Sequence, residues 1–277
     1  MGLETVRSLG HRTDLALLER SGSTLVDHGD HWVVRTPDNP AFWWGNFVLL
    51  RDTPAAADTP GWVARFEAHF PHARHRAFGV DGTRPGVEAL AGFAAAGYEV
   101  AADTVMTATA VRPPARPHTG ATLRRLESDD DWLQHTELAL SGQPDDESRE
   151  RERPFVTARG VSQRRLVKTG GGAWFGAFVE GRLVAQLGLV PAAHDGHGRP
   201  MARFQEVETH PAARGQGLAG TLVHHAGEYG FGELGASTLV MVADPGYAAI
   251  RIYRALGFTA TEQQVGASLP PGPGAQR

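Results

Sequence analysis

Apolar and polar positions follow two different periods along this chain, and each period predicts one kind of element. Short apolar runs bounded by glycine, proline or polar clusters predict strands, and apolar residues recurring every three to four positions predict helices. In the C-terminal half, strands are predicted at 122–127, 173–179, 182–190, 201–209 and 237–244. Helices are predicted at 129–140, 154–169, 218–229 and 247–257, with a polar loop at 141–153.

The N-terminal half shows a similar order of elements with parts missing. Helices are predicted at 14–20, 61–70 and 87–97, and strands at 31–37, 42–50, 75–80 and 99–111. The segments FAAAGY (93–98) and YRALGF (253–258) also share the pattern aromatic-x-Ala-x-Gly-aromatic. Together these features favour an ancient duplication.

A proline-rich stretch, VRPPARPHTG at 111–120, separates the two halves. Its prolines can continue neither a helix nor a central strand, which indicates a linker. We therefore expect a first domain over 1–112, a linker over 113–120, a second domain over 121–268 and a disordered tail over 269–277.

Composition narrows the class of protein. The 277-residue chain has a formal net charge of −4, which argues against a partner that is nucleic acid or an anionic membrane. No apolar run approaches the roughly 18 residues of a membrane span, and the N-terminal segment lacks the apolar core of a signal peptide. Without cysteine there is no thiolate nucleophile, disulfide or cysteine-bound metal. A cytoplasmic location is expected.

A glycine-rich turn at 214–220, within HPAARGQGLAG, lies between a predicted strand and a predicted helix. Unpaired N–H groups and the helix dipole attract an anion to a helix start, and glycines let the backbone close around it. Arg214 adds a cation. The segment is neither a Walker loop nor a G-x-G-x-x-G dinucleotide fingerprint. It predicts a diphosphate site, with an ordinary glycine-rich turn as the alternative.

Two motifs together carry a family resemblance. VETHPAARGQGLA at 207–219 and YRALGF at 253–258 resemble the paired signature of the GCN5-related N-acetyltransferase (GNAT) superfamily, over roughly 121–265. The resemblance implies an α/β (α+β) fold with a mixed, mostly antiparallel sheet, flanked by helices and splayed near the glycine turn. It implies acetyl-CoA as acyl donor and no metal. The N-terminal half lacks the turn, so the chain resembles two tandem copies of which the first is degenerate and binds no cofactor.

The resemblance also implies roles for individual residues. Backbone groups of Val207, Glu208 and Thr209 would bind the pantetheine arm, as an added strand would. Tyr253 would protonate the departing thiolate, or would simply be a core aromatic. Gly246 stands where the family often has asparagine, which puts one cofactor contact in doubt. The diphosphate would be held by seven consecutive residues: Arg214, Gly215, Gln216, Gly217, Leu218, Ala219 and Gly220.

Acetyl transfer to an amine also needs a base. Because the chain has no cysteine, direct attack by a primary amine in a ternary complex is favoured over an acetyl-cysteine intermediate. Glu206 and Glu208 share one face of the strand that leads into the glycine turn, and a carboxylate suits proton removal. Glu206, which lies further back from the diphosphate, is the first choice. The alternative to a catalytic role is that one or both of these side chains simply point to solvent.

The histidines do not predict a metal. His69, His72 and His75 recur every three residues, which suits neither a helix-borne i, i+4 pair nor a finger motif, and Pro71 interrupts them.

The expected acceptor is a small-molecule amine or a peptide N-terminus, and the expected assembly is a monomer or homodimer. The alternative function is a non-catalytic protein that keeps the fold and binds an acyl-CoA or a partner.

Overall fold

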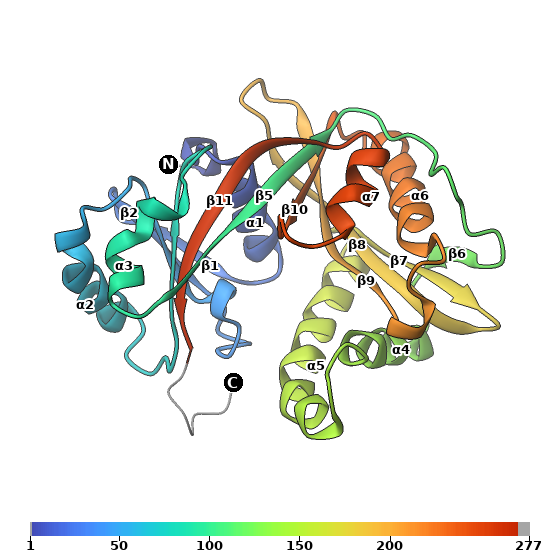
Figure 1. The fold of residues 1–277 in the computed structure, drawn as a ribbon, viewed down its shortest axis with the longest axis horizontal. Coiled ribbons are helices and arrows are strands. Elements are labelled where there is room, and N and C mark those ends of the chain that lie inside the picture. Colours follow the sequence, from blue (N-terminus) through green and yellow to red (C-terminus); the bar gives the residue numbers. More distant parts are fainter. Residues whose placement is uncertain (1, 271–277) are drawn as a thin grey trace. The chain divides into compact units, whose positions relative to one another are not determined.

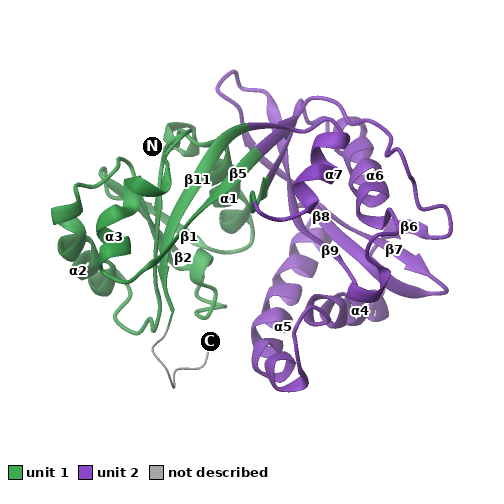
Figure 2. Cartoon of the chain, in the orientation of Figure 1, with its two compact units in different colours: residues 1–105, 242–245, 261–277 green, residues 106–241, 246–260 purple. Residues whose placement is uncertain are grey.

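The computed structural model describes residues 2–270 of the chain, which form two compact units (Figure 2). Unit 1 takes residues 1–105, 242–245 and 261–277, and unit 2 takes residues 106–241 and 246–260. Most of the tail for which disorder was predicted, 271–277, lies outside the described residues. Within 2–270, no helix is both long enough and apolar enough to cross a bilayer.

Unit 1 is a sheet with helices (Figure 1). Its strands follow the order β1-β2-β3-β4-β11-β5. β3 and β4 run parallel, whereas β1–β2, β2–β3 and β4–β11 are antiparallel. The strands are β1 Thr24–Asp27, β2 His31–Arg35, β3 Phe47–Leu50, β4 Arg76–Val80, β5 Glu99–Ala108 and β11 Thr259–Leu269. The helices are α1 Leu9–Arg20, α2 Thr59–His69 and α3 Ala91–Ala95, with 3-10 turns η1 Leu3–Thr5, η2 Trp43–Gly45, η3 Ala56–Asp58 and η4 Val87–Leu90.

Unit 2 contains a sheet in the order β10-β9-β8-β7-β6, in which only β9 and β10 are parallel neighbours. Its strands are β6 Thr122–Arg125, β7 Ala173–Val179, β8 Arg182–His194, β9 Pro200–Thr209 and β10 Thr238–Ala243. Its helices are α4 Asp129–Leu140, α5 Asp146–Lys168, α6 Leu218–Gly232 and α7 Ala249–Ala255, with the 3-10 turn η5 Pro211–Ala213. The predicted mixed, mostly antiparallel sheet flanked by helices is confirmed.

Two adjacent residues of β7 show how helices cover both faces of this sheet. Successive side chains of a strand point to opposite faces. The Trp174 ring lies 6.3 Å from the Trp132 ring of α4, and the Phe175 ring lies 5.1 Å from the Tyr229 ring of α6. Helix α4 therefore covers one face and α6 the other.

The two units repeat one arrangement of strand, helix and parallel strand. In unit 1, β3 leads through α2 to β4, its parallel neighbour. In unit 2, β9 leads through α6 to β10, again its parallel neighbour. This shared crossover supports the duplication that the order of predicted elements suggested.

The predicted polar loop at 141–153 is wrong, because α5 already begins at Asp146. Asp145 caps this helix by accepting a hydrogen bond from the Ser148 N–H, and two acidic residues occupy the first turn. The charged residues after Asp145 therefore form the first turns of a helix and not a loop. Pro154, the first residue of the predicted helix, lies inside α5.

The predicted strand at 42–50 begins only at residue 47, because 43–45 forms a 3-10 turn. The Asn46 side chain holds that turn by donating to the Phe42 carbonyl at 2.9 Å and accepting from the Thr36 N–H at 3.0 Å.

Strand β11 follows the last predicted helix and was not predicted. It pairs with β4 in unit 1, where Val265 lies opposite Val80 and is fully buried. The compact units therefore differ from the expected domains, because the final strand of the chain completes the sheet of the first unit. A core cluster of unit 1 includes β11 residues together with Phe66, Phe78 and Phe93.

Candidate functional site

The glycine turn joins β9 to α6 through the 3-10 turn η5. Gly215 and Gly217 both have positive φ angles, of 77° and 83°. Only glycine adopts this left-handed backbone without strain, so the turn requires glycine at both positions. Helix α6 begins at Leu218, with Gly217 as its N-cap.

The start of α6 is arranged differently from the starts of α4 and α5. Ser128 caps α4 and Asp145 caps α5, and both helices have acidic residues in their first turns. Helix α6 has no side-chain cap and no acidic residue in its first turn. Its N–H groups therefore remain available to an external anion, and Arg214 directly precedes the turn. These residues fit a diphosphate.

The expected linker packs against this turn within unit 2. The His118 N–H donates to Thr221 Oγ1 at 2.9 Å, and His118 Nδ1 lies 3.1 Å from the Gln216 carbonyl oxygen. A Cβ atom at Gly217 would collide with the Arg116 carbonyl oxygen, whereas one at Gly215 would meet nothing within 4 Å. Gly217 is thus required for its backbone angle and also for a close approach of two segments.

Strand β9 changes its course just before the turn. Its register with β8 shifts between the pairs Gly188–Gln205 and Gln186–Glu208, which marks a β-bulge. Within the bulge Glu206 has a φ of 48°, one of two positive values among non-glycine residues in 2–270. Such strained backbone persists where the surroundings impose it and is concentrated at functional sites.

The pairing of β9 with β10 covers only the first part of β9. Its register runs from Met201 to Arg203, while β9 continues to Thr209. The backbone of Val207, Glu208 and Thr209 therefore lies past this pairing, where the sheet is expected to splay.

The Glu206 carboxylate lies among polar side chains of α5. Oε1 accepts a hydrogen bond from Gln163 Nε2 at 2.6 Å and lies 3.1 Å from Arg159 Nε. Oε2 is buried and accepts no hydrogen bond from any described residue. Burial, with a smaller contribution from the Glu208 charge, raises the pKa of Glu206 to about 7, although Arg159 and Gln163 oppose this shift.

Glu208 lies on the same side of the sheet, toward α4. It accepts a hydrogen bond from Gln186 Nε2 at 2.7 Å, and the Gln186 amide also donates to the His135 carbonyl of α4 at 3.3 Å. Burial raises the pKa of Glu208. Burial also lowers the pKa of His135 to about 4, so this imidazole is neutral at pH 7. Neither glutamate points simply to solvent.

The polar partners of Glu206 and Glu208 were not predicted from the sequence. Arg159, Gln163 and His135 belong to helices predicted without any role for their polar faces. Gln186 offered one signal, because it interrupts the apolar run LVAQLGLV, and an unpaired buried amide would be costly.

Tyr253 lies on α7 and is 5% exposed. Burial, with a minor contribution from Tyr247, raises its pKa to about 12, so the phenol stays protonated at neutral pH. Helix α7 packs near the start of α6, where a Cβ atom at Gly220 would lie 3.4 Å from the Ile252 side chain. Gly246 lies in the exposed turn before α7.

The three histidines weighed as a metal motif are not brought together. His72 is exposed, and His75 Nε2 lies 2.9 Å from the Asn46 carbonyl oxygen, with its ring stacked on Trp43. His69 has other neighbours, His28 and His31.

Comparisons with known proteins show where this combination of a mixed sheet, a glycine turn and an uncapped helix is found. Residues 131–258 match the model of the acetyltransferase (GNAT) family, so this part of the chain is a GNAT domain. The family supports an acetyltransferase-type function. No curated protein matches the sequence.

Solved structures show that the likeness in fold extends over the whole chain. A GCN5-related N-acetyltransferase from Kribbella flavida aligns with a TM-score of 0.63 at 17% identity, over 96% of this chain and 97% of that one. A tandem GNAT protein from the clavulanic acid biosynthesis pathway aligns with a TM-score of 0.56 at 18% identity, over 99% and 94%. A functionally unknown conserved protein from Staphylococcus epidermidis aligns with a TM-score of 0.65 at 9% identity, over 90% and 95%. The N-terminal region is therefore GNAT-like in fold as well.

Proposed function

We propose that this protein transfers an acetyl group from acetyl-CoA to a primary amine, on a small molecule or a peptide N-terminus, by direct attack in a ternary complex. The observation that carries the proposal is the environment of the Glu206 side chain. Glu206 is a largely buried carboxylate with a pKa near neutrality, held at a bulge of the strand that leads into the glycine turn.

The acyl donor would be held mainly by backbone groups of unit 2. The N–H groups at the start of α6, from Leu218 to Gly220, would donate to the diphosphate together with Gly215 and Arg214. The β9 backbone at 207–209 would bind the pantetheine arm as a neighbouring strand would. When bound, acetyl-CoA supplies an activated acetyl thioester. Gly246 puts one further contact in doubt, whereas all these donors come from elsewhere in the unit.

Glu206 would remove the proton from the attacking amine. An amine is protonated at neutral pH and must lose a proton before it can attack a carbonyl carbon. A base with a pKa near the working pH serves best, because it is ionised often enough and still holds the proton well. Gln163 and Arg159 hold the carboxylate in place through its Oε1 atom. Glu208 is the second candidate for this role.

Tyr253 would return a proton to the sulfur leaving group. Its raised pKa keeps the hydroxyl protonated, which is the state that a general acid needs. The N-terminal unit would take no acetyl-CoA, because α2 begins with Asp58 and Thr59 before Pro60, where unit 2 has the glycine turn.

The second candidate function is a non-catalytic acyl-CoA- or partner-binding protein that keeps the fold. The departure at Gly246 is the observation that favours it. Calorimetric titration with acetyl-CoA, followed by thiol release across a library of primary amines, separates the two functions. Binding with thiol release supports the enzyme, and binding without release for any amine supports the alternative.

A matched pair of variants completes this experiment. Glu206→Gln removes the basicity and keeps the shape, and Glu228→Gln makes the same change at an exposed position of α6. We expect turnover to fall by about a hundredfold or more in the first variant only. Equal turnover in the two variants would contradict the role of Glu206.

A further inference from the structure

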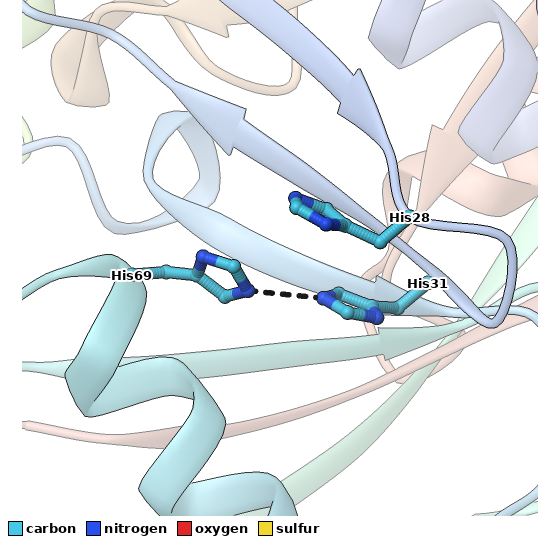
Figure 3. Close-up of side chains that lie close together, drawn as sticks. All are labelled: His28, His31 and His69. Atoms are coloured by element: carbon cyan, nitrogen blue, oxygen red, sulfur yellow. Dashed lines mark hydrogen bonds between the residues drawn. The ribbon is translucent and has the colours of Figure 1, made fainter.

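Three histidine rings from separate segments of unit 1 converge at one point (Figure 3). His28 follows β1, His31 opens β2, and His69 is the last residue of α2. The ring nitrogens of His31 and His69 face each other at 3.1 Å between the two Nε2 atoms. One nitrogen from each of the three rings lies within 4.8 Å of the others.

We propose that His28, His31 and His69 bind a divalent transition metal ion of the zinc class. Imidazole nitrogen is a preferred donor for such ions. Two nitrogens bound at tetrahedral angles to one zinc ion, each at about 2.0–2.1 Å, lie about 3.3 Å apart. The observed Nε2–Nε2 separation of 3.1 Å between His31 and His69 is close to that spacing.

The β1–β2 turn arranges two of the ligands in advance. The His28 N–H donates to the His31 carbonyl at 2.9 Å, and Asp27 Oδ1 accepts from the Gly29 N–H at 2.8 Å. Gly29 has a φ of 90°, which closes the turn. The two imidazole rings stack with centroids 4.7 Å apart and an interplanar angle of 7°. The exposed His28 ring would therefore rotate out of this stack to aim a nitrogen at the ion.

Asp30 orients the imidazole ring of His31 through a hydrogen bond to the nitrogen that faces away from His69. Its Oδ1 lies 2.6 Å from His31 Nδ1, so Nδ1 carries the proton and the lone pair of Nε2 points toward His69. Carboxylates commonly hold metal-binding histidines in this way. The other oxygen of Asp30 pairs with Arg65 at 2.6 Å, which fixes the carboxylate and neutralises the nearby cation.

Arg35 holds the end of α2 at His69. Arg35 lies 3.4 Å from His69 Nδ1 and also donates to the His69 carbonyl at 3.2 Å. Without a metal, Arg35, His69, His31 and Asp30 would form only a hydrogen-bonded chain, which is the competing interpretation.

Three protein ligands leave one position of a tetrahedral site for water or an external anion. His28 is exposed, so that position is open to solvent. The ion would link the β1–β2 turn to the end of α2, and these segments are otherwise joined by a long stretch of chain. Metal binding would therefore stabilise unit 1.

The test uses the untagged full chain, freed of metal by a chelator, and titrates it with Zn²⁺ alone by calorimetry and with Co²⁺ by visible absorption. We expect one saturable site per chain, with Co²⁺ bands typical of low coordination number. Zinc at a hundredfold excess over its Kd should raise the melting temperature of unit 1 by about 5 to 10 °C. Absence of saturable binding below about 1 mM would overturn the proposal and leave the hydrogen-bonded chain.

Variants then locate the ion. His69→Gln and His28→Gln should each abolish tight binding, and Asp30→Asn should weaken it about 10- to 100-fold. His72→Gln, at an exposed histidine three residues beyond α2, is the control and should bind as the wild type does. Because His28 is exposed, His28→Gln tests the site without disturbing the core. Unchanged zinc affinity in a still-folded His28→Gln and His69→Gln pair would refute this site.

Discussion

Gln163 Nε2 donates to Glu206 Oε1 at 2.6 Å, which ties α5 to the bulge of β9 at the most strained residue of that strand. A hydrogen bond to an ionised carboxylate stabilises its charged form, whereas burial destabilises it. Here burial dominates, and the pKa of Glu206 rises to about 7. The balance between these two effects sets the pH range in which the carboxylate can act as a base.

The first prediction concerns the pH profile of acetyl transfer. Because Glu206 must be ionised to accept a proton, kcat/KM should rise with pH and level off above about 7. Glu206→Gln should lose this inflection and retain only the one that belongs to the amine substrate. Stopped-time thiol-release assays between pH 5.5 and 9 measure both profiles. An inflection near 7 that persists in Glu206→Gln would assign it to another group.

Replacing Gln163 should move the same inflection. Gln163→Met removes the donor and keeps the length of the side chain, so the carboxylate loses a stabilising hydrogen bond and its pKa rises further. We expect the midpoint of the pH profile to shift upward, with turnover at pH 9 near that of the wild type. Lower turnover at every pH with an unmoved midpoint would show that Gln163 has only a packing role.

The stability of the protein should also depend on Glu206. Its pKa is raised in the folded state above the ordinary value of 4.5, so the folded state binds more protons between these values. The free energy of unfolding should therefore fall as pH rises from about 4.5 through 7, and Glu206→Gln should lose that part of the decline. Urea denaturation at pH 5 and pH 8 tests this. A wild type and a variant with the same pH dependence would argue against a buried charge at Glu206.

Arg214 should contribute to acetyl-CoA affinity and not to folding. It is exposed, and its Nε donates to the Thr209 carbonyl at 3.3 Å. Arg214→Gln should weaken binding about 10- to 100-fold, since charge-assisted hydrogen bonds contribute roughly 1.5–3 kcal/mol, and should leave the melting temperature unchanged. Arg182→Gln, at an exposed arginine of β8, is the matched control. Calorimetry showing equal affinities for both variants would contradict the diphosphate site.

Tyr253→Phe removes only a hydroxyl group. If that hydroxyl protonates the leaving sulfur, turnover should fall by roughly ten- to a thousandfold while acetyl-CoA affinity and melting temperature change little. A core role predicts wild-type turnover with at most a small loss of stability. Steady-state kinetics together with a thermal melt distinguish these results.

The sequence predicted those parts of the fold that local patterns determine. The 129–140 helix matches the prediction because a capped, amphipathic segment needs no information from elsewhere in the chain. Strand β11 was missed because its residues alternate weakly, and only pairing with β4 makes Val265 a core residue. Helix α5 was placed too late because the charged residues up to 153 were assigned to a polar loop, although the acidic cap lies among them.

The candidate site likewise has parts that a local sequence pattern determines and parts that depend on distant segments of the chain. The glycine turn is a continuous motif, so its positive φ angles could be anticipated from residues 215 and 217 alone. The partners of Glu206 come from a distant helix, and no local pattern joins Gln163 to β9. The histidine cluster shows this most clearly, because His69 was weighed with its neighbours in sequence, while its neighbours in space are His28 and His31.

The position of β11 has a consequence for the order in which the chain can fold during synthesis. β4 can pair with β3 early, but it acquires its second neighbour, β11, only when residues 265–269 have left the ribosome, long after residues 76–80. The N-terminal unit is the first to be made, yet its sheet is the last to close. A nascent chain stopped after residue 117 exposes an unsatisfied edge beside β4, which invites aggregation or chaperone binding. Trimming the protein at residue 258 would accordingly damage the unit that is built mainly from residues 1–105.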